Sequence, residues 1–323
     1  MNYNIFIVAG PLHIINAIEA RDYFNTQNNI LLILYTDNNH QLSQMKRLLN
    51  FYKWDKTIYL PLPMKKIDKI FFAKRVKKIL KDIKMDYISN IFVGEYRSDH
   101  VNHIVNSLNS DKVYLLDDGL AQLDYHQETN NIPNRVKFRR FFYRIISYKL
   151  KSIDYTFFTI YNIPNVKIVR NSYTFFKKYI SLKQIENKIY FIGQPLVELK
   201  VINQKDYIKK LSKIIEIYRN IEFVYILHRR EKRENIEKIS LELNFEYREF
   251  DNPIEIEMLQ TDTLPNYFAT FYSSAIVTLP SFITQSEYRV FKIDEKNINP
   301  KFIDNINGTY KELEKMGLEV TTI

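Results

Sequence analysis

The chain has no cysteine and little glycine, and both shortages exclude whole classes of site. Its 323 residues include 6 Gly, beside 24 Tyr and 22 Phe. Without thiols the protein forms no disulfide and no thiolate zinc site. With so little glycine, it has neither the Gly-rich loop of P-loop proteins nor a G-x-G-x-x-G dinucleotide motif. Any phosphate group must therefore be held by other means.

Long hydrophobic runs are also missing. No stretch approaches 18 uninterrupted apolar residues, so we expect no transmembrane helix. The apolar run at residues 3–9 lacks the basic residues that precede a signal-peptide core, and Pro11 and His13 follow it closely. This run is more typical of a buried first strand that turns into a helix. The sequence therefore predicts a cytoplasmic protein.

The positive charge is concentrated in two stretches. The chain has a net charge of +10. Residues 65–84 hold nine Lys/Arg and two Asp, and residues 135–151 hold seven Lys/Arg and no acid, so each has a net charge of +7. Apolar side chains are interleaved at helical spacing, which leaves two interpretations open. In the first, the two stretches are surface helices with solvated basic faces. In the second, they are helices attracted to an anionic phospholipid surface. No nucleic-acid motif accompanies the charge, so we expect no nucleic-acid partner.

Strand-like and helical patterns alternate along the chain. In the first half the strand patterns cover residues 3–9, 30–35, 56–60, 87–93 and 113–116. The alternation restarts at residues 189–192, and such alternation predicts parallel α/β sheets. We expect two Rossmann-like domains, residues 1–185 and 186–323. A closing helix at residues 308–316 is a candidate to cross back onto the first domain.

Four polar islands follow predicted strands. They are Asp117-Asp118-Gly119, Gly193-Gln194-Pro195, His228-Arg229-Arg230 and Ser273-Ser274. In open α/β sheets, ligands bind beyond the carboxyl ends of the strands. A fifth segment, Gly10-Pro11-Leu12-His13, lies at the first strand-to-helix turn, where a glycine lets the backbone approach a ligand closely. The islands thus predict a cleft that is lined by loops after the strands of two sheets.

These motifs resemble, in order and spacing, those of bacterial sialyltransferases of the GT-B type. The resemblance is to glycosyltransferase family 52 in particular, and to its relatives in families 38 and 80. Their acidic D/E-D/E-G, His-Pro and Ser-Ser/Thr motifs are similar to Asp117-Asp118-Gly119, His228-Arg229 and Ser273-Ser274. Residues 10–13 and 191–198 are also similar to the family. One departure is Arg229, which stands where the relatives have proline.

The resemblance implies a GT-B fold, with two Rossmann-like domains and a cleft between them. It further implies an inverting glycosyltransferase that moves sialic acid from CMP-sialic acid to a galactose-ended surface glycan, as in lipooligosaccharide or capsule. The N-terminal domain would serve the acceptor and carry the catalytic base. The C-terminal domain would bind the CMP-sugar donor.

The resemblance also assigns roles to particular residues. Asp118 is the preferred base, since it adjoins Gly119, and Asp117 stays open as the alternative. His228 would hold the CMP phosphate and stabilise the leaving group, together with Ser273 and Ser274. Glu257 would bind the ribose, with Glu255 as second choice. The implied substrate-binding residues are Gly10, Asp117, Gly119, Gln194, Pro195, Glu257, Ser273 and Ser274.

No metal and no other cofactor is expected, because histidine and hydroxyl groups can serve the leaving phosphate. The expected partners are the nucleotide-sugar donor and a glycan or glycolipid acceptor. Two further candidates are the anionic inner surface of the cell membrane and a second copy of the chain in a homodimer. Two alternatives remain open. One keeps the fold with a UDP-hexose or another CMP-nonulosonate as donor. The other is a non-catalytic basic protein that binds membranes or nucleic acid.

Overall fold

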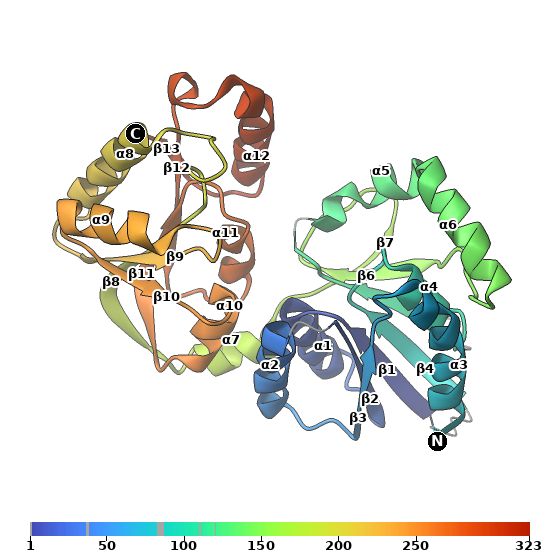
Figure 1. The fold of residues 1–323 in the computed structure, drawn as a ribbon. Helices are drawn as coiled ribbons and strands as arrows, with labels where there is room; N and C mark the ends of the chain where they lie inside the picture. The colour runs from blue at the N-terminus through green and yellow to red at the C-terminus, as the bar shows by residue number, and fades with distance from the viewer. Residues whose placement is uncertain (1, 37–38, 83–86, 109, 111, 120) are drawn as a thin grey trace. The chain divides into compact units, whose positions relative to one another are not determined.

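A computed structural model describes residues 2–36, 39–82, 87–108, 110, 112–119 and 121–323 (Figure 1). Two compact units make up the chain, Met1–Phe175 and Phe176–Ile323. The domain boundary that the sequence predicts, after residue 185, lies ten residues further along the chain than the boundary between these units. The residues between belong with the second unit, since the Lys183 ammonium donates to the Leu259 carbonyl at 2.9 Å. Residues 83 and 84 of the first basic stretch lie outside the described part.

The first unit contains a parallel sheet, which the described residues arrange in the order β3-β2-β1-β4-β5-β6-β7. All of its strand pairs are parallel. The five strands predicted in this half are confirmed, each with boundaries within one residue of the prediction. The strands are β1 (Asn2–Val8), β2 (Asn29–Tyr35), β3 (Lys56–Pro61), β4 (Tyr87–Val93), β5 (Val113–Leu116), β6 (Tyr155–Thr159) and β7 (Lys167–Arg170).

Helices cover both faces of this sheet. Figure 1 shows α1 (Pro11–Tyr23) and α2 (Asn39–Leu48) on one face, and α3 (Lys66–Asp82) and α4 (Asp99–Val105) on the other. Pro11 stands at the first position of α1, where its fixed φ suits the helix and its missing N–H costs nothing. The remaining helical segments of the unit are η1 (Leu49–Phe51), η2 (Ala121–Asp124), α5 (Tyr125–Asn130) and α6 (Asn134–Ile145).

The second unit repeats the plan with a sheet in the order β10-β9-β8-β11-β12-β13. The strands are β8 (Gln184–Ile192), β9 (Glu222–Leu227), β10 (Glu246–Glu249), β11 (Thr263–Thr270), β12 (Glu287–Lys292) and β13 (Val320–Thr322). The helical segments are α7 (Thr174–Ile180), α8 (Gln204–Ile217), α9 (Arg233–Leu243), α10 (Ile254–Gln260), α11 (Ala275–Thr278), η3 (Leu279–Ser281), η4 (Glu295–Asn297), η5 (Pro300–Phe302) and α12 (Ile303–Lys315). The expected closing helix is α12, which contacts β13 of its own unit.

Each sheet has a point at which the strand order reverses. In the first unit the chain runs outward through β1, β2 and β3, and then crosses to β4 on the other side of β1. In the second unit it runs through β8, β9 and β10, and then crosses to β11 on the other side of β8. Ligands of such sheets bind at the carboxyl ends of the strands beside this reversal. The fold therefore directs attention to the loops after β1, β4 and β5, and after β8, β9 and β11.

No helix in the described part of the chain is long and apolar enough to cross a membrane.

Candidate active site

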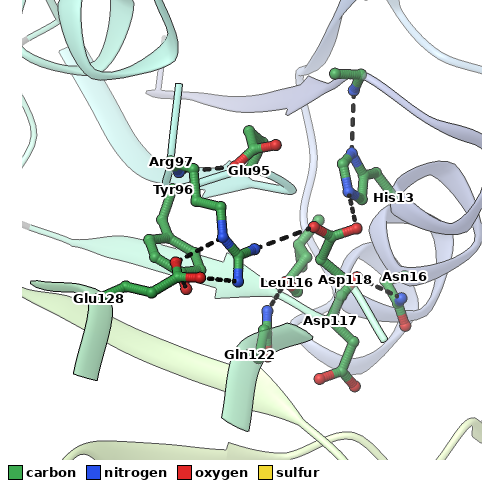
Figure 2. A network of polar contacts seen from close by, with 11 residues as sticks. His13, Asn16, Glu95, Tyr96, Arg97, Leu116, Asp117, Asp118, Gln122 and Glu128 are labelled. Atoms are coloured by element: carbon green, nitrogen blue, oxygen red, sulfur yellow. Dashed lines mark hydrogen bonds and ion pairs between the residues drawn. The ribbon is translucent and has the colours of Figure 1, made fainter. Parts of the chain in front are cut away.

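Asp118 follows β5 and lies between the His13 ring and the Arg97 guanidinium (Figure 2). Its Oδ1 is 2.9 Å from Nε2 of His13, which follows β1, and its Oδ2 is 3.8 Å from Nη1 of Arg97, which follows β4. The Asp118 side chain is 30% exposed. Three strand ends thus converge on one carboxylate that is held in orientation and still reachable from solvent. A general base needs this combination.

The ring of His13 is fixed from both sides. The Ala9 N–H donates to Nδ1 at 3.2 Å, so in the neutral ring the proton is on Nε2, which donates to Asp118. Gly94, directly after β4, packs against this ring, and a Cβ at position 94 would overlap it. A glycine at the end of β4 is therefore what lets the buried histidine reach the carboxylate.

Arg97 is anchored by Glu128 on the far side of the site (Figure 2). Its Nε is 2.6 Å from Glu128 Oε2, and the Tyr96 hydroxyl donates to the same oxygen at 2.7 Å. The Arg97 N–H donates to Glu95 Oε1 at 2.7 Å. The hydrogen bond from Arg97 is the main cause that lowers the pKa of the Glu128 carboxyl. The guanidinium facing Asp118 is thereby held in place by a second carboxylate.

Sequence reasoning missed this part of the site. Residues 94–97 (Gly-Glu-Tyr-Arg) form another polar island directly after a strand, with the same signature as the four islands that were recognised. Their position directly after a strand was thus the signal that could have identified these residues. The partner Glu128 gives no such signal, because it lies on a helix about 30 residues away in sequence.

The neighbouring Asp117 points to the other side of the chain (Figure 2). It is 2% exposed, and its Oδ2 accepts a hydrogen bond from the Ile160 N–H at 3.0 Å. Burial raises the pKa of this carboxyl to about 7. Asp117 therefore ties β5 to the end of β6 and does not face solvent, which favours Asp118 over Asp117 as the base. Gly119 has a φ of +67°, a conformation that suits glycine.

Gly10 stands at the N-cap of α1, with extended backbone. It lies beside the Ala9–His13 contact that orients the histidine. Its backbone is therefore part of the same strand-to-helix turn. A role for Gly10 in substrate binding stays a prediction.

In the second unit, His228 follows β9 and Ser273 follows β11, and both strands pair with β8. Neighbouring strands lie about 4.8 Å apart, so these two strand ends are about 10 Å apart at one edge. Burial, and then Arg229 and Arg230, lower the pKa of the His228 imidazole. The Arg230 N–H donates to Nδ1 at 3.1 Å, which directs the ring N–H to Nε2. Joint binding of one phosphate by these residues stays a prediction.

The turn after β9 is closed without the proline of the His-Pro motif. The His228 N–H donates to Glu231 Oε2 at 2.7 Å, and the Glu231 N–H donates to the His228 carbonyl at 2.8 Å. The Tyr225 hydroxyl donates to Glu231 Oε1 at 2.6 Å, and burial raises the pKa of the carboxyl to about 7. Gly193 leaves room for this arrangement, since a Cβ there would overlap Glu231 and Tyr225. Glu231, which sequence reasoning did not select, shapes the loop that carries His228.

Gln194 and Pro195 lie at the reversal point of the second sheet. The Gln194 Oε1 accepts from the Tyr272 N–H at 2.9 Å and from the Thr270 hydroxyl at 3.2 Å. Pro195 is buried. The amide of Gln194 therefore joins the loops after β8 and β11. Contact of either residue with a substrate stays a prediction.

The two serines and the two glutamates differ in their surroundings. Ser273 is half-buried, and Ser274 is exposed and makes no side-chain cap on α11, a helix of only four residues. Glu257 Oε1 accepts from both the backbone and side-chain N–H of Asn252, at 3.0 and 2.6 Å. Glu255 Oε1 accepts from the Thr278 hydroxyl at 2.7 Å. Their assignment to phosphate and ribose stays a prediction.

The described residues contain no group of three or more His, Asp or Glu side chains arranged to hold a metal ion.

No protein-family model matches the chain, and no curated protein sequence does. Solved structures do. The chain is similar to a UDP-GlcNAc 2-epimerase from Methanocaldococcus jannaschii, with a TM-score of 0.54 and 15% identity over 98% of this chain and 92% of that one. It is also similar to a sialyltransferase from Photobacterium damsela, with a TM-score of 0.50 and 11% identity over 100% of this chain and 81% of that one. At these identities the likeness establishes the fold, and it confirms the predicted class: an α/β protein of GT-B type with two Rossmann-like domains.

Proposed function

We propose that this protein is an inverting glycosyltransferase that moves sialic acid from CMP-sialic acid to a galactose-ended surface glycan, and that it belongs with the sialyltransferases of family 52. One observation carries the proposal. Asp118, in the D-D-G motif, is a partly exposed carboxylate at the reversal point of the first sheet, held by His13 and Arg97. The fold shared with a solved sialyltransferase is compatible with this function.

In the proposed reaction, Asp118 accepts the proton of the acceptor hydroxyl as its oxygen attacks the anomeric carbon. The new C–O bond forms while the bond from that carbon to the CMP phosphate breaks, and CMP leaves with the bonding electrons. His13 holds one carboxylate oxygen by a hydrogen bond, and Arg97 faces the other. These contacts fix the carboxylate, so that little reorientation is needed at the moment of proton transfer.

The second unit supplies the donor site in this proposal. His228, Ser273 and Ser274 hold the CMP phosphate, and Glu257 or Glu255 binds the ribose. In the free protein the pKa of His228 is lowered by burial and by two arginines. The phosphate of the bound donor is a diester with one negative charge, and this charge beside the ring raises that pKa, so donor binding favours the protonated imidazole. An imidazolium there stabilises the negative charge that grows on the leaving phosphate, and no metal is needed for this step.

Thermal shift with free nucleotides tests the donor assignment. We expect CMP to raise the melting temperature of the protein, because ligands that bind the folded state stabilise it. UDP at the same concentration should raise it less. EDTA should leave the CMP effect unchanged. Selective stabilisation by UDP would replace CMP-sialic acid by a UDP-sugar, and stabilisation by neither nucleotide would contradict a transferase.

We also propose that the protein docks on an anionic membrane through the outer faces of α3 and α6. Exposed apolar side chains form a stripe at i, i+3, i+4 and i+7 along α6, and α3 carries a similar, shorter set. The two helices are neighbours, since the Lys69 ammonium of α3 lies over the Tyr143 ring of α6 at 5.5 Å. We call this set the apolar stripe: Phe138, Phe141, Phe142 and Ile145 on α6, and Ile67, Ile70 and Phe71 on α3.

Charge decides which kind of surface fits the apolar stripe. Both helices come from the two stretches that each carry a net charge of +7. Apolar groups flanked by Lys and Arg are typical of helices that lie in the interface of anionic lipids. Such docking would place the enzyme on the inner face of the cell membrane, beside a glycolipid acceptor.

A further inference from the structure

The first unit contains a cavity that is separate from the carboxylate of Asp118. Its volume is about 310 Å³, at the lower end of the range for small-ligand sites. Its walls come from the loop after β4, from α4, α5 and α6, and from the segment before β6. The lining residues on which the argument rests are Tyr96, Tyr125, Tyr155, Arg140, Arg144 and Lys151.

The charge of this lining is one-sided. Three of its side chains are cationic, and none of its residues is Asp or Glu. Arg140 is offset by the buried Asp99, whose Oδ1 lies 2.7 Å from its Nε. Arg144 donates to the Leu150 carbonyl at 3.0 Å. Within the described part of the chain, neither Arg144 nor Lys151 forms an ion pair. Two cations therefore remain to attract an anion.

Three tyrosines complete the walls. Burial raises the pKa of each phenol, at Tyr96, Tyr125 and Tyr155, so they stay neutral at physiological pH. Neutral phenols add apolar ring surface and no negative charge. A small compound with one anionic group and a larger uncharged body fits such walls better than an extended polyanion does.

The cavity is connected to the proposed base through one carboxylate. The Tyr96 hydroxyl, on the cavity wall, donates to Glu128 Oε2 at 2.7 Å, and Arg97 contacts the same oxygen at 2.6 Å (Figure 2). Arg97 in turn faces Asp118. The two cationic residues from α6, Arg140 and Arg144, belong to the helix whose exposed face carries the apolar stripe.

We infer that this cavity is a second ligand site, which binds a phosphate monoester carried by the acceptor. The inference rests on the proposed function, because the site would hold the acceptor on the unit that carries the base. The same phosphate chemistry occurs on a sugar and on a lipid headgroup. We assign it to a phosphorylated sugar, because the rings of the three phenols suit a compact sugar ring and two exposed cations lie beside them.

Calorimetric titration at fixed ionic strength tests the site with glucose 1-phosphate, glucose, inorganic phosphate and dihexanoyl phosphatidic acid. We expect glucose 1-phosphate to bind the wild-type protein more tightly than the other three compounds. The double variant R144Q/K151Q should bind it about 10- to 100-fold more weakly, because it loses two charge-assisted contacts. The matched control R135Q/K137Q removes two exposed charges of α6 outside the cavity and should bind it as wild type does.

If R144Q/K151Q is poorly folded by circular dichroism, S152E places a negative charge in the same lining and should weaken binding in the same way. Equal affinity in wild type and the cavity variants would overturn the inference, as would tighter binding of phosphatidic acid than of the sugar phosphate. CMP binding should be unchanged in the cavity variants. Loss of the CMP effect in wild type, with the sugar phosphate still bound, would instead remove the proposed donor and leave the cavity site standing.

Discussion

The two units share one topology and display opposite chemistry at the same edge. At the reversal point of the first sheet, the Asp118 carboxylate is partly exposed and is held by the His13 ring and the Arg97 guanidinium. At the corresponding edge of the second sheet, the half-buried carboxylate of Glu231 closes the loop, and His228 follows the strand beside two arginines. A glycine makes room in both places, Gly94 for a histidine and Gly193 for a glutamate.

This difference shows how one sheet plan serves two tasks. A proton acceptor needs a negative group in reach of the substrate, whereas a phosphate site needs positive charge and N–H or hydroxyl donors. The loops alone decide which of these a unit presents. The following predictions test whether the two edges divide the work in this way.

The largest expected effect is on the base. Asp118→Asn should lower the transfer rate by about 10²–10⁴-fold, the usual contribution of a general base, because the amide cannot accept the proton. CMP binding, assigned to the other unit, should stay as in wild type. Enzyme kinetics and CMP titration measure the two. Asp154→Asn, an exposed carboxylate of the same unit, is the control and should be active. Near-normal turnover by Asp118→Asn would remove Asp118 from the mechanism.

Substitutions at the edge of the second sheet should weaken CMP binding, which Asp118→Asn should leave unchanged. Ser273→Ala combined with Ser274→Ala should weaken CMP binding by about 1–3 kcal/mol, the range for hydrogen bonds to a charged group. His228→Ala should weaken CMP binding and also slow transfer, since stabilisation of the leaving group grows in the transition state. Calorimetry gives the affinities, with the exposed Ser212→Ala of α8 as control. Unchanged CMP affinity in both variants would move the phosphate site elsewhere.

Gly94 and Gly308 differ in how much space surrounds them, and substitutions at the two positions test the packing around His13. Gly94→Ala should destabilise the protein by about 1–3 kcal/mol, the cost of overpacking, and should lower transfer as well, because the His13 ring must move. Gly308, inside α12, has nothing within 4 Å of where its Cβ would lie. Gly308→Ala should therefore stabilise the protein by about 1 kcal/mol, the helix-propensity difference. Denaturant unfolding measures both, and a Gly94→Ala protein with normal stability and turnover would contradict the tight fit at His13.

The smallest effect concerns the apolar stripe, which only the first unit carries. Wild-type protein should co-sediment with anionic liposomes more than with neutral ones, and salt at about 150 mM should weaken this, because the Debye length is then about 8 Å. Phe138→Ser with Phe142→Ser should reduce binding. Leu182→Ser with Leu241→Ser, two exposed apolar residues of the second unit, should not. Equal binding to both liposome types would leave α3 and α6 as ordinary surface helices.

Much of the fold could be predicted from local patterns. Strands β4 and β5 were predicted with the boundaries that the structure shows, because β5 is a wholly apolar run and β4 ends in one. Strands β7, β12 and β13 were not predicted. They are short or only partly buried, so their sequences carry little apolar signal.

The site was predictable in part for a related reason. Asp118 and His228 could be selected because each follows a clear strand. The pairing of His13 with Asp118 joins residues 105 positions apart, and only the strand order brings them together. The roles of Glu128 and Glu231 likewise depend on partners that the sequence does not identify.

The most direct measurement of the central claim is a donor screen with mass detection of the product. Wild-type protein is incubated with a galactose-ended acceptor and, separately, with CMP-sialic acid and several UDP-hexoses. The account predicts an acceptor that gains one sialic acid residue from CMP-sialic acid, with release of CMP, and no gain from the UDP-hexoses. An acceptor left unchanged by CMP-sialic acid, or extended by a hexose from a UDP-sugar, would contradict it.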